Sequence, residues 1–255
     1  MTLLQLQGVS RRFGGVLAVD SLDLNVEAET IHGLIGPNGS GKTTALNVIS
    51  GYYRPSDGRV LFDGHEISRL PSHAIARRGL ARTFQNLRLF RAMSVLDNIL
   101  VPMQAAQPHS LLDVVLRPAL ARAADDEARV RGRQLLRLLD VEHTADLPAR
   151  ALPYGLQRRV EIARALASKP RLLLLDEPAA GLNPAEISDL EQILRQIQAR
   201  GMTILLIEHH VRLVMALCNR ITVLNYGRKI AEGEARAVSQ DPAVVHAYLG
   251  DEDPE

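Results

Sequence analysis

A glycine-rich segment at residues 36–43 has the residue types and spacing of a loop that binds a nucleoside triphosphate. It reads Gly-Pro-Asn-Gly-Ser-Gly-Lys-Thr and matches G-x-x-x-x-G-K-[ST] at every fixed position. Glycines let successive backbone N–H groups curl around phosphate oxygens. Lys42 then reaches the β and γ phosphates, and Thr43 offers a hydroxyl to Mg²⁺. The predicted nucleotide-binding residues of this segment are Gly36, Pro37, Asn38, Gly39, Ser40, Gly41, Lys42, Thr43 and Thr44.

An acidic pair supplies the groups that would turn binding into hydrolysis. Asp176 and Glu177 follow a run of four leucines, residues 172–175, which is typical of a strand buried on both faces. Adjacent strand residues point to opposite sides, so Asp176 can face Mg²⁺ while Glu177 faces the γ-phosphate and holds the attacking water. An isolated Asp-Glu pair often only caps a turn, but the loop upstream favours the catalytic interpretation.

Two further residues are candidates by position. His209 follows the apolar strand 204–207 and is expected at the same sheet edge as Asp176, where an imidazole can hydrogen-bond a phosphate or water. Its neighbour His210 leaves the choice between the two histidines open. Phe13 precedes Gly14 and Gly15 in a polar stretch, where its ring is free to lie against a base.

The elements that must position these residues alternate between strand and helix. Leu22, Leu24 and Val26 alternate with polar residues, which predicts a half-buried strand. Further strands are expected at 30–35, 60–62, 172–175 and 202–207, with a hairpin at 221–224 and 228–231. Helices are expected after Lys42, ending at Gly51, and from Asn183 through Pro184 and Glu186. A mixed sheet with helices on its faces follows.

The middle of the chain is predicted to be helical. Ser94 and Asp97 have capping-box spacing, and residues 129–139 form an amphipathic pattern. Pro102, Pro108 and Pro118 are expected to cut this region into pieces. We therefore predict one domain over residues 1–250. Its nucleotide-binding core comprises 1–91 and 158–250, 92–157 form a helical subdomain, and 251–255 form a loose tail.

Composition excludes several classes of protein. Of 255 residues, 46% are hydrophobic, which excludes disorder, and a net charge of +1 gives no strong field for nucleic acid. We expect no nucleic-acid partner, and we expect the arginine groups 77, 78, 82 and 158, 159, 164 on solvated helix faces. The single cysteine and the absence of a secretory signal favour a cytosolic setting. The longest apolar runs are strand-sized, below the roughly 20 residues that span a bilayer.

Taken together, these motifs resemble the ATP-binding subunits of ABC transporters over nearly the whole chain. The matching elements are Phe13, residues 36–43, Gln85 in Arg-Thr-Phe-Gln-Asn, residues 152–159 in the place of the signature L-S-G-G-Q, Leu175-Asp176-Glu177-Pro178, the D-loop at 180–183, and Glu208-His209. The resemblance implies an α/β P-loop NTPase fold with a RecA-like core, an antiparallel β-subdomain and a helical subdomain. It implies ATP and Mg²⁺ as cofactors, and His209 rather than His210 as the switch histidine.

The same resemblance implies roles for residues that motif chemistry alone does not assign. Phe13 would stack on adenine, and Gln85 would touch Mg²⁺ or the attacking water and relay nucleotide state to a membrane partner. Gly155 with Gln157 would contact the ATP held by a facing subunit. The implied catalytic residues are Glu177, His209 and Gln85, and the implied metal ligands are Thr43, Gln85 and Asp176.

Within that family the chain looks like the longer ATPase of branched-chain (hydrophobic) amino-acid importers, which carries extra helical residues near 101–131. This implies transmembrane permease subunits, a second and different ATPase in a heterodimer, and a substrate-binding protein as partners, at the cytoplasmic face of the membrane. Urea or amide importers and lipopolysaccharide exporters share parts of the pattern. A soluble ABC ATPase acting on nucleic acid is the alternative from another class, but it usually has two ATPase halves or a long coiled coil.

The signature segment departs from the family pattern at two positions. Pro153 stands where serine is usual, which removes a hydroxyl and an N–H donor, and Leu156 removes a further polar group. We expect the following helix to begin only near Gln157. An apolar strip, Leu87 to Phe90 with Met93, is expected to form part of a groove for a cytoplasmic helix of the permease.

Overall fold

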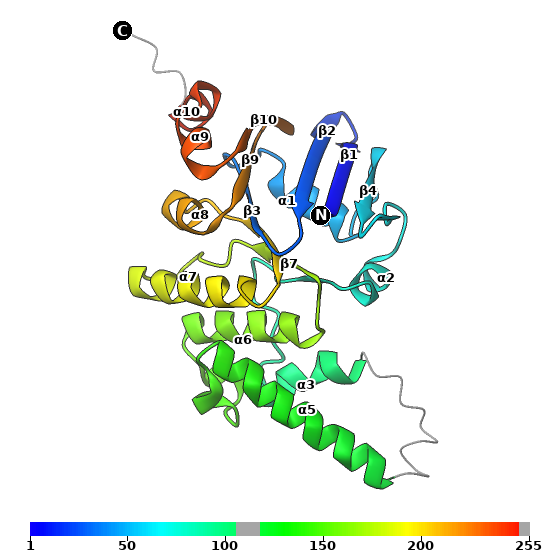
Figure 1. Ribbon diagram of the computed structural model, residues 1–255, viewed down its shortest axis with the longest axis vertical. Helices are drawn as coiled ribbons and strands as arrows, with labels where there is room; N and C mark the ends of the chain where they lie inside the picture. The colour runs from blue at the N-terminus through cyan, green and yellow to red at the C-terminus, as the bar shows by residue number, and fades with distance from the viewer. Residues whose placement is uncertain (106–117, 250–255) are drawn as a thin grey trace.

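The computed structural model describes residues 1–105 and 118–249, which form two β-sheets with helices around them (Figure 1). A four-stranded antiparallel sheet has the order β2-β1-β4-β5, and a six-stranded sheet has the order β10-β9-β3-β8-β7-β6. The antiparallel sheet contains β1 (Thr2–Phe13), β2 (Val16–Glu27), β4 (Asp57–Phe62) and β5 (His65–Glu66). The other contains β3 (Ile31–Ile35), β6 (Leu80–Arg82), β7 (Leu172–Asp176), β8 (Thr203–Ile207), β9 (Arg220–Asn225) and β10 (Arg228–Gly233).

The six-stranded sheet is parallel except at its β10 edge and is buried on both faces. Strand β3 lies between β8 and β9, and β7 lies between β8 and β6. Along β7, Leu172 and Leu174 enter the core shared with the antiparallel sheet, whereas Leu173 and Leu175 enter the core beneath the helices. Two-sided burial explains why this strand is apolar throughout rather than alternating.

The antiparallel sheet buries only one face. In β2 the predicted alternation is confirmed: Leu22, Leu24 and Val26 are buried, while Asp23 and Asn25 are exposed. Helix α1 (Lys42–Ile49) packs in the core between the sheets. As expected, Gly51 follows the end of this helix in a left-handed conformation, with φ 70°. The core therefore packs around the end of β3 and the start of α1.

Helices cover the opposite face of the six-stranded sheet. They are α6 (Tyr154–Ala167), α7 (Pro184–Gln198), α8 (Val211–Leu217), α9 (Ala235–Ser239) and α10 (Pro242–Leu249). A short helix, α2 (Ser72–Arg77), precedes β6, and two 3-10 turns occupy Glu142–Thr144 and Ala149–Ala151. Helix α7 begins at the predicted cap, Asn183, and forms a capping box in which the Asn183 side chain accepts from the Glu186 N–H and the Glu186 carboxylate accepts from the Asn183 N–H.

The helical subdomain packs α3 (Val95–Ala105) and α5 (Pro118–Leu138) against α6, at the lower end of Figure 1. Of the predicted capping box at Ser94 and Asp97, the cap itself is present: the Ser94 Oγ accepts from the Asp97 N–H, while the Asp97 carboxylate accepts from the Ser94 hydroxyl rather than from its N–H. Pro102 lies inside α3, so the expectation that it ends a helical piece was wrong. Helix α5 begins well before residue 129, and the expected boundary at 157 falls inside α6.

Some predictions concern residues that the structure does not describe. Pro108, much of the extra helical stretch expected near 101–131, and the tail at 251–255 lie outside the described residues. Within residues 1–105 and 118–249, no helix has both the length and the apolar character needed to cross a bilayer.

Candidate nucleotide site

The phosphate loop joins the end of β3 to the start of α1 under tight packing. A Cβ added to Gly36 would lie 2.1 Å from the Leu224 carbonyl oxygen, and one added to Gly41 would lie 2.4 Å from that of Ala18. Gly41 also has φ 100°, as the residue that caps α1. Only glycine fits these two positions, so the sequence pattern is imposed by close backbone approach as well as by any ligand.

Lys42 folds back on the loop that precedes it. Its Nζ donates to the carbonyl oxygens of Gly36 at 2.7 Å and Pro37 at 2.8 Å, and the residue is 7% exposed. Burial lowers the pKa of Lys42, and the nearby carboxylates of Glu177 and Asp176 oppose that shift. The ammonium group therefore lies within electrostatic reach of both acidic residues predicted to serve the same site.

A cavity of about 350 Å³ opens over the loop. It is lined by residues 38–44, by residues 16–18 at the start of β2, by Glu177, and by Tyr226 and Gly227 in the β9–β10 turn. The Gly227 N–H donates to the Ser40 carbonyl at 3.0 Å, which fixes that turn against the loop. Tyr226 is 85% exposed and was not among the predicted site residues.

Three predicted catalytic side chains meet at the edge of this cavity. The Gln85 Nε2 donates to the Glu177 Oε2 at 3.0 Å, and the His209 Nδ1 lies 3.8 Å from the Glu177 Oε1. Glu177 follows β7 and has φ 49°, a left-handed conformation that residues with a Cβ seldom adopt. Its N–H donates to the Ile207 carbonyl at 2.9 Å, which joins the ends of β7 and β8. His209, not His210, is the histidine beside Glu177.

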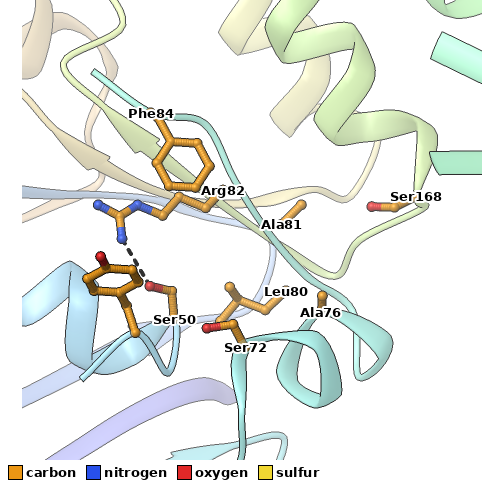
Figure 2. Close-up of a pocket in the computed structure, with 9 residues that line it drawn as sticks. Ser50, Ser72, Ala76, Leu80, Ala81, Arg82, Phe84 and Ser168 are labelled. Carbon is orange, nitrogen blue, oxygen red and sulfur yellow. Dashed lines mark hydrogen bonds between the residues drawn. The ribbon is translucent and has the colours of Figure 1, made fainter. Parts of the chain in front are cut away.

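Asp176 is held by an arginine that the sequence analysis placed elsewhere. Arg82 donates to the Asp176 Oδ2 at 2.9 Å, and both side chains are largely buried. The same guanidinium donates to the Asn47 Oδ1 at 2.7 Å and to the Ser50 Oγ at 3.0 Å on α1, the second of which Figure 2 shows as a dashed line. Arg82 lies on β6, so its assignment to a solvated helix face was wrong.

Arg158 and Arg159, from the second arginine group, do not lie on a solvated helix face either. Arg158 is completely buried and forms an ion pair with Glu161 at 2.9 Å. Arg159 is 9% exposed and bridges to Asp140 and Asp189. Net charge could not reveal this, because each of these arginines is neutralised by an acidic residue on the helix or loop beside it.

A buried carboxylate joins the two loops that carry Glu177 and His209. Glu208 is completely buried; its Oε1 accepts from the Ala179 N–H at 2.7 Å, and its Oε2 accepts from the N–H groups of His209 and His210 at 3.1 and 3.3 Å. The only sequence signal for this role is an acidic residue placed directly after a strand buried on both faces.

The signature segment begins α6 earlier than expected. The helix starts at Tyr154 with Pro153 as its N-cap residue, three residues before Gln157. A Cβ on Gly155 would lie 2.4 Å from the Glu186 Oε1, so Gly155 allows α6 to approach the start of α7. The Gln157 Nε2 donates to the Leu152 carbonyl at 2.7 Å, which turns this side chain toward its own segment.

Phe13 ends β1 with its ring already in contact with other side chains. Its centroid lies 5.0 Å from that of Tyr53 in an edge-on arrangement, and the Arg11 guanidinium lies 4.6 Å from it. The ring is 37% exposed and is not part of the lining of the cavity over the loop. Stacking of Phe13 on adenine therefore stays a prediction.

Comparison with protein families identifies the chain over most of its length. Residues 19–180 match the family model described as "ABC transporter", and residues 228–254 match that described as "Branched-chain amino acid ATP-binding cassette transporter". The chain is 41% identical to the high-affinity branched-chain amino acid transport ATP-binding protein BraF of Pseudomonas aeruginosa and 42% identical to LivG of Escherichia coli, over 98% of both chains in each case. It is 34% identical to the lipopolysaccharide export system ATP-binding protein LptB of Escherichia coli, over 99% of both.

Solved structures of ATP-binding cassettes also match the chain. The ADP conformation of MJ1267, an ATP-binding cassette of an ABC transporter, has a TM-score of 0.85 at 31% identity, covering 98% of this chain and 100% of that one. The dimeric, post-hydrolysis cassette MJ0796, bound to ADP and Pi, has a TM-score of 0.78 at 25% identity and covers 92% of this chain and 99% of that one. With matches of this extent in sequence and in structure, the chain belongs to the ABC transporter family as an ATP-hydrolysing, ATP-binding subunit.

Proposed function

We propose that this chain hydrolyses ATP to power the import of branched-chain or other hydrophobic amino acids. The observation that carries the proposal is the meeting of Gln85, Glu177 and His209 beside the phosphate loop. The amino-acid substrate rests on the full-length similarity to BraF and LivG and on the match at residues 228–254. This chain would contribute the energy source, and the selection of substrate would fall to other subunits.

In this proposal the phosphate groups of ATP lie against the N–H groups of residues 36–44, and Lys42 exchanges its carbonyl partners for phosphate oxygens. Glu177 accepts a proton from the attacking water, because its carboxylate lines the cavity next to the loop. Gln85 and His209 orient the Glu177 carboxylate and the water, since Gln85 donates to one carboxylate oxygen at 3.0 Å and the His209 Nδ1 lies 3.8 Å from the other. The partly exposed ring of Phe13 would contact adenine.

The residues also fit a magnesium ion. Thr43 lines the cavity, Gln85 lies beside Glu177, and Asp176 is bound by Arg82 through Oδ2, which leaves its other oxygen for a ligand or a bridging water. Hydroxyl, amide and carboxylate oxygens are the donors that Mg²⁺ prefers. The ion would neutralise charge on the phosphate oxygens during transfer.

A second ATPase subunit is required to complete each site. The phosphate loop precedes α1, whereas the signature segment begins α6, in the lower part of the molecule (Figure 1). We propose that the segment around Gly155 contacts ATP held by a facing subunit, and the dimeric state of the relative MJ0796 supports pairing of two such chains. Because Gln157 turns toward Leu152, the backbone N–H groups at the start of α6 would provide most of that contact.

The permease would dock on the surface between the core and the helical subdomain. Figure 2 shows a cavity there with Arg82, Phe84, Ser50 and Ser168 around it, and Tyr52 also lines it. Phe90 is 49% exposed and lines a neighbouring cavity with Arg82, so the groove for a cytoplasmic helix would include Phe84 and Tyr52 together with the strip Leu87 to Phe90 and Met93. A peripheral position at the cytoplasmic face of the membrane follows.

The decisive experiment is reconstitution. Membrane vesicles containing this chain with its co-expressed permease and ATPase partners should accumulate radiolabelled leucine only when ATP and the substrate-binding protein are supplied. The same vesicles without this chain serve as the control. The similarity to LptB makes lipopolysaccharide extraction the second candidate. ATP-dependent release of lipopolysaccharide without leucine uptake would replace the proposed substrate while leaving the ATPase assignment intact.

A further inference from the structure

A buried ion pair on α6, between Arg158 and Glu161, binds the backbone of the segment that carries Gln85. The Arg158 Nη1 donates to the Phe84 carbonyl at 2.8 Å, and its Nη2 donates to the Gln85 carbonyl at 3.0 Å. The partner carboxylate, Glu161, accepts from the Arg88 N–H at 3.2 Å. Arg158 and Glu161 are 0% and 1% exposed, respectively.

This arrangement fixes main chain rather than side chains. Phe84, Gln85 and Arg88 contribute backbone groups, so the pair fixes the path of residues 84–88 whatever their side chains do. Within the described residues, no other side-chain hydrogen bond reaches the Gln85 carbonyl. Arginine is suited to this role because its planar fork places donors on two separate Nη atoms that serve different acceptors, whereas the three donors of a lysine share one nitrogen.

The same guanidinium is connected to the start of the signature helix. Its Nη2 also donates to the Tyr154 hydroxyl at 2.9 Å, and a Cβ on Gly181 in the D-loop would lie 3.3 Å from the Tyr154 ring. Arg158 therefore contacts the first turn of α6, which faces the opposite ATP in the proposed dimer, and also the backbone of Gln85, which serves the ATP of its own subunit.

We propose that the Arg158–Glu161 pair is a positioning device that sets Gln85 toward Glu177 and makes Gln85 and the start of α6 move as one body. The inference rests on the proposed role of Gln85. Burial of two charges is costly unless both are paired and hydrogen-bonded. Here the two Nη atoms of Arg158 make four hydrogen bonds, one of them to Glu161, and only its buried Nε has no partner among the described residues.

The chain offers a matched control. Arg159 is the next residue on α6, is almost as buried, and is also ion-paired, but its partners Asp140 and Asp189 lie away from residues 84–88. Arg158→Gln and Arg159→Gln therefore remove comparable charges from one helix, and only the first removes the contacts to the Gln85 segment.

The first measurement is hydrogen exchange of the full-length chain. Arg158→Gln should raise exchange of the peptide covering 83–90 by about tenfold or more, because the Glu161 acceptor of the Arg88 N–H loses its fixed position. Arg159→Gln should leave that peptide unchanged. Equal protection of residues 83–90 in all three proteins would overturn the proposal.

The second measurement is a double-mutant cycle on the kcat of the assembled transporter. Arg158→Gln and Gln85→Ala should each lower kcat by about tenfold or more with KM for ATP changed less than about threefold, and the double variant should be no slower than the slower single variant. Losses that multiply would show that Arg158 acts independently of Gln85 and would overturn the proposal. Unchanged kcat in Gln85→Ala alone would refute the proposed role of Gln85, and the exchange data would still decide what Arg158 holds.

If Arg158→Gln does not fold, Arg158→Lys serves in its place. Lysine keeps the positive charge opposite Glu161 but has a single nitrogen in place of the two Nη atoms that bind the Phe84 and Gln85 carbonyls. Hydrogen exchange of residues 83–90 and the double-mutant cycle on kcat are measured for this variant as well, and the same results support or overturn the proposal. Tyr154→Phe, which removes one acceptor at the helix start, should reproduce a smaller part of the kinetic effect without raising exchange at 83–90.

Discussion

Glu177 combines a left-handed backbone with a carboxylate held by two neighbours, and such local strain is typical of functional sites. The hydrogen bond from its N–H to Ile207 and the contacts of Gln85 and His209 keep the residue in this conformation. Glutamine has the same shape and can adopt the same backbone, so Glu177→Gln removes the proton acceptor with little change in structure.

We expect Glu177→Gln to bind ATP with nearly unchanged affinity and to lose turnover, because the loop carries binding and the carboxylate acts only in the chemical step. Equilibrium binding of a fluorescent ATP analogue, together with steady-state ATPase assays, measures both. Glu191→Gln, at a partly exposed position on α7 where the carboxylate pairs with Arg195, is the matched control. Turnover within about tenfold of wild type would contradict the assignment of the base.

Lys42 is expected to matter in a different way, because it serves the loop as well as the nucleotide. Lys42→Ala removes the donor to the Gly36 and Pro37 carbonyls and the charge beside the phosphates, so both ATP affinity and ATPase activity should fall, the latter by about 100-fold or more. Lys169→Gln, at an exposed lysine, should behave as wild type. An ATPase rate above about a tenth of wild type would argue against the loop assignment.

At the scale of elements, the position of Pro153 can now be interpreted. It is the N-cap residue of α6, a position that favours serine because a hydroxyl can accept from N–H groups of the first turn. Pro153→Ser should therefore preserve or raise ATPase activity in the assembled transporter. Gly155→Ala is the contrast: its Cβ would meet Glu186, and activity should fall. Reduced ATPase activity in Pro153→Ser would contradict the proposed contribution of the helix start.

Strand β3 carries the other element-scale prediction. His32 is 1% exposed beside Thr222, and burial lowers its pKa from 6.5 to about 4. The folded chain therefore favours the neutral ring, so stability is fully present above pH 6.5 and is lost as pH falls toward 4. The free energy of unfolding in urea should drop by ~2 kcal/mol between pH 7.5 and pH 5 from this group. His32→Gln should show a flatter pH dependence; an equal slope would exclude His32 as the cause.

Most elements near the site were predictable because local physics determines them. The apolar run 172–175, the alternation in β2 and the caps at Ser94 and Asn183 each report burial or capping within a few residues. Strand β6 and the roles of Arg82, Arg158 and Glu208 were not predictable. Each depends on partners far away in sequence, as in the pairing of Arg82 with Asp176, and no local period records such a contact.

At the scale of the whole molecule, the proposed dimer requires one chain to contribute to two different ATP sites. The loop lies on one side of the six-stranded sheet, and the start of α6 lies below it (Figure 1). Glu177→Gln should trap the ATP-bound assembly, so size-exclusion chromatography with light scattering should show a dimer with ATP and the partner ATPase, and monomers without ATP. Weak ATP-dependent self-association is expected for this chain alone. Strictly monomeric protein with ATP and the partner present would contradict a shared site.

The strand order has a consequence for synthesis of the chain on the ribosome. Strand β3, which presents the phosphate loop, has β8 and β9 as its neighbours, through pairs such as Ile31 with Ile204 and Ile35 with Val223. The strand that leads into the loop therefore emerges early but has no strand partner until the last third of the chain has been made. Closing contacts of such long range is slow. The capacity to hold nucleotide is thus acquired late, and a nascent chain cannot begin an ATP cycle before its C-terminal strands are in place.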